Sequence, residues 1–138
     1  MKFGKPRVVV FDTSALIGAV LRPKSLPAQA LQKASVECHI AASDETLREL
    51  VEVLGRDKFD AYCSREGRIA FLEMYLALVI IHSVTATATE CRDPKDNKFL
   101  SLAISAEAAA IVSSDDDLRV LHPYHDVAIL SPAAFLET

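Results

Sequence analysis

The chain has 138 residues, of which 51% are hydrophobic, and its formal net charge at pH 7 is −4. This length suits one domain with a substantial core. The acidic balance argues against a general electrostatic attraction to nucleic acid, although metal ions and a few local lysines or arginines could still hold one. No apolar stretch approaches the ~20 residues of a membrane-spanning helix.

Strands and helices alternate along the chain, which predicts an α/β domain around a mainly parallel sheet. The first half is expected to hold strand 7–11, helices 14–21 and 27–34, strand 38–42, and a helix from the N-cap Ser43 to Gly55. The second half is expected to hold helix 65–77, strand 79–84, a helix over 93–106, and strands 109–112 and 127–130. Without a linker or repeat, residues 1–138 are predicted to form a single domain.

The N-terminus and the cysteines carry less specific signals. The charged N-terminus leads into only a short apolar segment that contains Asp12, so we do not expect a signal peptide. The three cysteines, Cys38, Cys63 and Cys91, form no C-x-x-C pair. We interpret them as reduced thiols in a cytoplasmic protein.

Two of the predicted strands run into aspartate. Asp12 follows the first strand directly, and Asp115, Asp116 and Asp117 follow strand 109–112 closely. Because ligands of open α/β sheets bind outside the carboxyl ends of the strands, these carboxylates are expected at one edge. Clustered carboxylates repel one another unless a cation lies among them, and a hard divalent ion such as Mg²⁺ or Mn²⁺ is suitable.

Each of these aspartates also has a purely structural explanation. Asp12 could cap the helix that follows it, and one of the three later aspartates could cap a helix at Leu118. A strand-like alternation would point Asp115 and Asp117 the same way and Asp116 to solvent.

Three further acids can be explained by helix geometry. Asp93 is suited to be an N-cap, and Asp96 would complement the dipole of the same helix. Glu49 lies opposite the apolar stripe of its helix, so periodicity alone assigns it to a solvated acidic face. The chain has no P-loop, G-x-G-x-x-G or G-x-S-x-G motif, so nucleotide binding and serine hydrolysis lack their usual sequence marks.

Taken in order, several segments resemble the PIN-domain family of metal-dependent ribonucleases, in particular its VapC-related toxin branch. The resemblance covers nearly the whole chain, and it rests on the order and spacing of the fragments rather than on any one of them. The fragments are Val8–Leu16 with its Asp-Thr-Ser opening, Ser43–Leu50 with the helical acid Glu49, Arg92–Leu100 with R-D-P-x-D-N, Ile111–Leu118 with D-x-D-L, and Leu130–Leu136.

The resemblance implies a three-layer α/β/α fold and an endoribonuclease that uses one or two Mg²⁺ or Mn²⁺ ions. It turns Glu49 toward the sheet edge and makes Asp96 a candidate ligand. The implied catalytic residues are Asp12, Glu49, Asp96 and Asp115, and the implied metal ligands are Asp12, Asp96, Asp115 and Asp117. The residues expected to support them are Thr13, Ser14, Asp93 and Ser113.

The resemblance also implies an RNA substrate, a homodimer and a small antitoxin protein that blocks the site. This chain departs from the family pattern in having Ser113-Ser114 where Thr-Gly is usual and Asp116 where a lysine is frequent. Two other functions stay open from the residues alone. One is a non-catalytic PIN-like module that binds RNA or protein, and the other is an aspartate-based phosphohydrolase.

Overall fold

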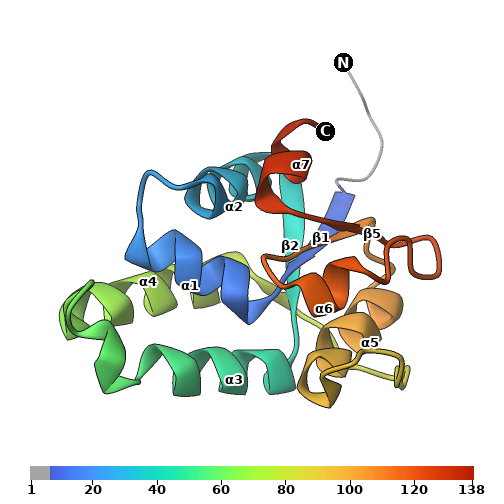
Figure 1. Cartoon of the computed structure of the whole chain (residues 1–138), viewed down its shortest axis with the longest axis horizontal. Helices are drawn as coiled ribbons and strands as arrows, with labels where there is room; N and C mark the ends of the chain where they lie inside the picture. The colour runs from blue at the N-terminus through green and yellow to red at the C-terminus, as the bar shows by residue number, and fades with distance from the viewer. Residues whose placement is uncertain (1–6) are drawn as a thin grey trace.

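Five parallel strands form a single sheet in the computed structural model, which describes residues 7–138 (Figure 1). Residues 1–6, which belong to the segment considered as a signal peptide, lie outside the described residues. The sheet order is β3-β2-β1-β4-β5, and each neighbouring pair is parallel. The strands are β1 (Arg7–Phe11), β2 (Cys38–Ala42), β3 (Ile80–Ile81), β4 (Ala110–Val112) and β5 (Ala128–Leu130).

Helices follow the strands and cover the sheet. The α-helices are α1 (Thr13–Leu21), α2 (Leu26–Glu37), α3 (Asp44–Leu54), α4 (Arg65–Leu78), α5 (Asn97–Ser105), α6 (Asp116–Arg119) and α7 (Pro132–Leu136). Two 3₁₀ helices, η1 (Asp57–Phe59) and η2 (Pro94–Asp96), precede α4 and α5. Among the described residues, no helix is both long and apolar enough to cross a membrane.

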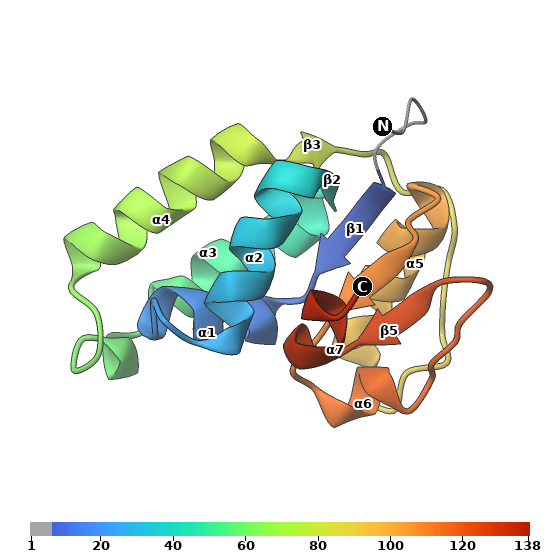
Figure 2. The ribbon, with the colours of Figure 1, turned by 90° about the horizontal axis from the view of Figure 1, so that it is seen from above.

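The sheet separates two hydrophobic cores. Val9 and Phe11 point into the core that contains the buried side chains of α1, α2, α3 and α7. Val10 and Ile111 point into the other core, which is built mainly from α5. Figure 2 shows α2 and α4 on one side of β1 and α5 on the other. Because successive strand residues face opposite sides, a continuous apolar strand serves both cores. The predicted three-layer α/β/α fold is confirmed.

The order in which the chain adds strands to the sheet reverses its direction between β1 and β4. From β1 the chain proceeds through α1 and α2 to β2, whereas from β4 it proceeds through α6 to β5 on the opposite side. The two strands are also joined just beyond their ends, where the Asp12 N–H donates to the Val112 carbonyl over 3.0 Å. Such a reversal opens a crevice at the carboxyl edge of a parallel sheet. The residues that follow β1 and β4 therefore border one crevice.

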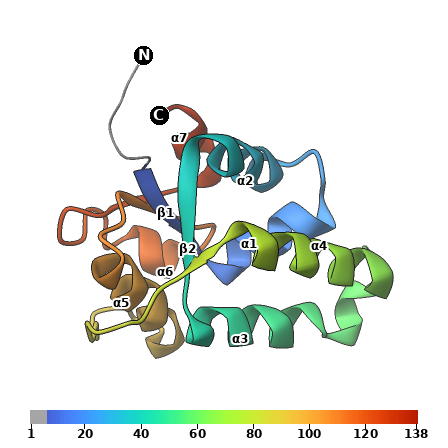
Figure 3. The same ribbon diagram turned by 180° about the vertical axis from the view of Figure 1, so that it is seen from behind.

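Most element boundaries agree with the sequence predictions, and two do not. The strand predicted over 79–84 is only Ile80–Ile81, because β3 is an edge strand that pairs on one side with β2 alone. The segment after it reaches α5 without regular structure until η2 (Figure 3). The sequence analysis did not predict α7, a five-residue helix capped by Ser131. Its Phe135 is fully buried and packs edge-on against Phe11, so packing determines this helix.

Candidate active site

Asp12 is both a helix cap and a buried site residue, so the two interpretations of this residue are compatible. It is the N-cap of α1, where its Oδ1 accepts hydrogen bonds from the Ala15 N–H and the Ser14 hydroxyl, each at 2.8 Å. Its Oδ2 accepts from the Ser113 hydroxyl at the end of β4. The carboxylate is 2% exposed, and burial raises its pKa to about 6 despite these hydrogen bonds.

Asp96 and Asp115 approach Asp12 from two other elements. Asp96 ends η2, and burial followed by its interactions with Asp115 raises its pKa to about 7. Its Oδ2 is buried and has no hydrogen-bond partner. Asp115 caps α6 by accepting from the Asp117 N–H at 2.8 Å. Neighbouring negative charges disfavour the ionised forms of Asp12 and Asp96, so a positive charge bound among them would relieve this repulsion.

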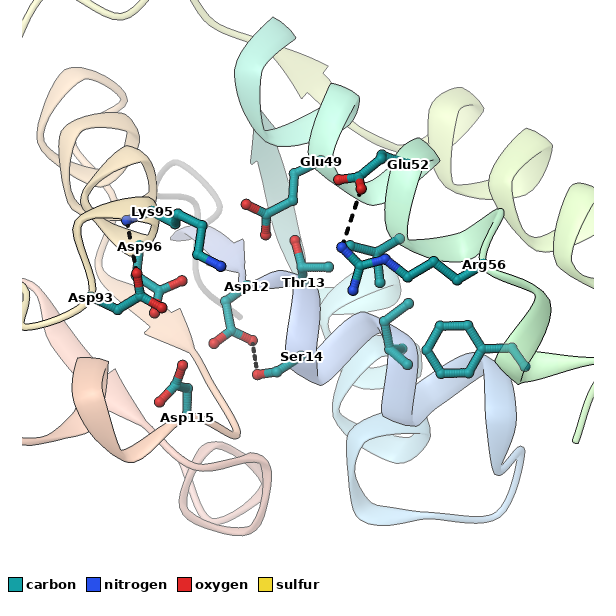
Figure 4. A pocket seen from close by; sticks show the side chains of 13 residues that line it. Asp12, Thr13, Ser14, Glu49, Glu52, Arg56, Asp93, Lys95, Asp96 and Asp115 are labelled. Carbon is teal, nitrogen blue, oxygen red and sulfur yellow. Dashed lines mark hydrogen bonds and ion pairs between the residues drawn. The ribbon is translucent and has the colours of Figure 1, made fainter.

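These carboxylates line one open cavity of about 400 Å³ at the carboxyl edge of the sheet (Figure 4). It contains all four of the expected catalytic residues and three of the four expected supporting residues. The lining side chains are Asp12, Thr13, Ser14, Ile17, Glu49, Glu52, Val53, Arg56, Phe59, Asp93, Lys95, Asp96 and Asp115. The fourth supporting residue, Ser113, lies behind this lining and is held to Asp12.

Glu49 enters the cavity from α3 (Figure 4). Its side chain is only 21% exposed and is paired with the ammonium group of Lys98 in α5. Periodicity assigned Glu49 to a solvated face, and that assignment is wrong. Helix α3 packs its apolar stripe into the core, and α5 lies beside another face of the helix. Helix periodicity within α3 cannot predict this contact, because α5 comes from a distant part of the sequence.

Asp117 and Asp116 turn away from this cavity. Asp117 does not line it, and its Oδ1 lies 2.8 Å from a guanidinium nitrogen of Arg92. Asp116 is exposed and pairs with Arg119. The expected alternation, with Asp115 and Asp117 on the same side, is wrong because Asp115 caps α6, so Asp116 and Asp117 follow helical rather than extended geometry. The inclusion of Asp117 in a ligand set stays a prediction.

Comparison with known proteins assigns the family. A family model described as PIN domain matches residues 8–117, which is most of the chain. The chain belongs to the PIN-domain family. An uncharacterised relative, MJ1680 of Methanocaldococcus jannaschii, is 30% identical over 112 residues, which cover 80% of this chain and 72% of that protein.

Solved structures share the fold of this PIN domain. VapBC2 from Rickettsia felis, bound to a DNA fragment from its promoter, has a chain that matches with a TM-score of 0.65 and 17% identity. The match covers 90% of this chain and 98% of that one. VapC20 of Mycobacterium tuberculosis, described as a sarcin-ricin loop cleaving toxin, matches with a TM-score of 0.55 and 13% identity over 87% and 98% of the two chains.

The donor set of this PIN domain fits a hard divalent cation. Carboxylate oxygens are the ligands that Mg²⁺ and Mn²⁺ prefer, and the unpartnered Oδ2 of Asp96 is an oxygen that such an ion could bind. Within residues 7–138, however, no three side chains of His, Cys, Asp or Glu are gathered closely enough to form a complete ligand group.

The sequence analysis missed one basic residue of the cavity. Arg56 lines it from the residue after the Gly55 cap of α3, with a nitrogen 3.2 Å from Glu52 on the preceding turn. The i, i+4 spacing of Glu52 and Arg56 is visible in the sequence, but it predicts an ordinary exposed pair. Lys95 is a second basic residue that lines the cavity.

Proposed function

We propose that this chain is a single-domain, Mg²⁺- or Mn²⁺-dependent endoribonuclease and the toxin component of a toxin–antitoxin pair. The observation that carries the proposal is the meeting of Asp12, Asp96 and Asp115 in one cavity at the reversal of the sheet. Three elements that are far apart in sequence supply these acids. A stabilising role for each helix end would not require their carboxylates to border the same cavity.

The residues of the cavity would have different roles in phosphodiester hydrolysis. Asp12, Asp96 and Asp115 would hold the divalent cation, which when bound supplies Lewis-acid activation of water and of the scissile phosphate. Ser14 and Ser113 keep the Asp12 carboxylate oriented, since both hydroxyls donate to it. No histidine lines the cavity in the described part of the chain, which suits a reaction that needs no imidazole base.

The proposed partners follow from the relatives that share the fold. The Rickettsia felis match is part of a VapBC2 complex with promoter DNA, and the Mycobacterium tuberculosis match is described as a toxin that cleaves the sarcin-ricin loop. By this likeness we propose an RNA substrate, a small antitoxin that covers the cavity, and a homodimer in the cytoplasm. Arg56 and Lys95 line the same cavity as the acids, which supports a proposed role for both in contacting RNA phosphates.

The two alternatives make different demands on the site. An aspartate-based phosphohydrolase needs a nucleophilic oxygen on Asp12, but both oxygens already accept hydrogen bonds. A non-catalytic module is favoured by the lack of a ready ligand group among the described residues. A calorimetric titration with Mn²⁺ distinguishes that module from the nuclease, because the module should bind no metal.

The first test is the substitution Asp12→Asn. It should abolish Mg²⁺-dependent cleavage of RNA, with a loss of at least about 100-fold, because the neutral amide removes a ligand charge while it can keep the helix cap. The measurement is a cleavage assay on structured and unstructured RNA. Asp116→Asn is the matched control, since that exposed carboxylate lies outside the cavity. Cleavage by Asp12→Asn at the rate of the parent chain would refute the proposal.

A further inference from the structure

One lysine beside the acidic cavity is already paired with an acid of its lining. The Lys98 side chain is 11% exposed, and its ammonium group donates to the Glu49 carboxylate. The same ammonium donates to the Lys95 carbonyl in η2 and lies 5.7 Å from the centre of the Phe99 ring. A long flexible side chain loses considerable entropy when it is held at several points. Lys98 is therefore a fixed internal counter-ion of Glu49.

The four acids expected to be catalytic differ in the charge that faces them. Glu49 has a lysine partner, whereas Asp96 has an oxygen that is buried and unpartnered. Asp12 accepts only neutral donors, which are two hydroxyls and a backbone N–H. Asp115 is likewise held by a backbone N–H. Among the described residues, Glu49 therefore makes an ion pair, whereas Asp12, Asp96 and Asp115 make none.

We propose that Lys98 takes the place of a divalent cation at Glu49, so that the RNA-free protein binds a single ion at the three aspartates. This inference rests on the proposed metal-dependent function and specifies the number of ions in that site. A second ion at Glu49 would have to displace an ammonium group that is already desolvated and hydrogen-bonded. Lys98 is thus a positioning residue, which holds Glu49 against η2 and keeps a second ion out.

The test is a titration of the full chain with Mn²⁺ in the absence of RNA. Calorimetry and the EPR signal of free Mn²⁺ each measure how many ions the chain binds and how tightly. The wild type should bind one ion per chain, and Glu49→Gln should leave its affinity within about twofold, because Lys98 already neutralises that carboxylate. Lys98→Met should expose Glu49 and produce a second binding event. The double variant with Lys98→Met and Glu49→Gln should return to one ion.

Lys95→Met is the matched control for charge alone. It removes a lysine that lines the same cavity, and its side chain makes no ion pair among the described residues. Any general gain in cation affinity from a lost positive charge should appear in this variant too. Thermal unfolding of each variant checks that the fold is retained, and the double variant removes both partners, so no unpaired charge remains.

The outcomes separate this inference from the proposed function. If Lys98→Met titrates like Lys95→Met, or if Glu49→Gln alone weakens binding tenfold or more, Lys98 does not exclude an ion and the inference is wrong. The nuclease proposal would survive both results. If the wild type binds no Mn²⁺, or if Asp96→Asn binds it as the wild type does, the metal centre itself is refuted and this inference with it.

Discussion

At the scale of single residues, Asp12 is a helix cap that the proposed function also makes a metal ligand. As an N-cap it accepts the Ala15 N–H, and as a buried carboxylate it stands among other acids. Its raised pKa means that the ionised form is held at a cost to the folded state, which three hydrogen bonds only partly offset. Under the proposed function, this residue is therefore a local conflict between stability and activity.

The conflict predicts a pH dependence of stability. Asp12 binds its proton more tightly in the folded chain, with a pKa of about 6, than in the unfolded chain, where the aspartate pKa is about 3.9. Its contribution to stability is therefore complete below about pH 4 and is lost as the pH rises through about 6. Asp12→Asn should become more stable than the wild type over this range, by on the order of 3 kcal/mol in EDTA.

Urea unfolding at a series of pH values measures this difference in the free energy of unfolding. The matched control is Asp116→Asn, because that carboxylate is exposed and lies outside the cavity. A difference between Asp12→Asn and the wild type that stays constant from about pH 4 to about pH 7 would show that burial does not perturb Asp12.

At the scale of elements, the N-terminal ends of helices position the site. Asp12 caps α1, Asp115 caps α6, and Asp93 caps η2 by accepting from the Lys95 N–H at 3.1 Å. Each cap fixes a carboxyl-bearing residue at the start of an element that leaves the carboxyl edge. Glu49 instead depends on the direction of α3, which is set by the capping box of Ser43 and Thr46.

Ser43→Ala tests the contribution of that capping box. It removes the hydroxyl that accepts from the Thr46 N–H at 3.2 Å, and it should lower the free energy of unfolding by about 1 kcal/mol. Ser35→Ala is the control, because this exposed serine lies inside α2 and donates only to the Gln32 carbonyl. Equal urea midpoints for Ser43→Ala and the wild type would contradict the assigned role of Ser43.

At the scale of the whole molecule, the C-terminal helix α7 packs against elements from the first part of the chain. Helix α7 packs against α2, and Lys33 of α2 donates to the carbonyls of Leu136 and Thr138. Phe135 fills the core beside Phe11, one residue before Asp12. The C-terminal helix thus supports the strand whose end carries the central acid of the site (Figure 1).

Phe135→Ala should accordingly destabilise the entire fold. Removal of a fully buried aromatic ring costs about 3–5 kcal/mol, and the change should appear as a lower urea midpoint in a single cooperative transition. Val36→Ala serves as the control, since this side chain is 80% exposed and its loss should change stability by less than about 0.5 kcal/mol. A loss below about 1 kcal/mol for Phe135→Ala would mean that α7 is not part of the core.

Local signals predicted most of the fold and two acids of the candidate site, Asp12 and Asp115. Apolar strands separated by amphipathic helices require a parallel sheet, and a parallel sheet brings Asp12 and Asp115 to one edge. Helix caps such as Ser43 and Asp93 were equally visible, because capping depends on neighbouring residues only. The edge strand β3 was overestimated and α7 was missed, since their extents depend on pairing and packing with distant residues.

The sequence by itself therefore determined the sheet and the acids that follow its strands. The tertiary structure alone decided that Glu49 faces Lys98 and that Asp117 leaves the cavity for Arg92. These pairings join residues that are 49 and 25 positions apart, and they depend on how α3, α5 and α6 pack around the sheet. Periodicity gives the face of a helix on which a residue lies, but the charge that meets this face comes from another element.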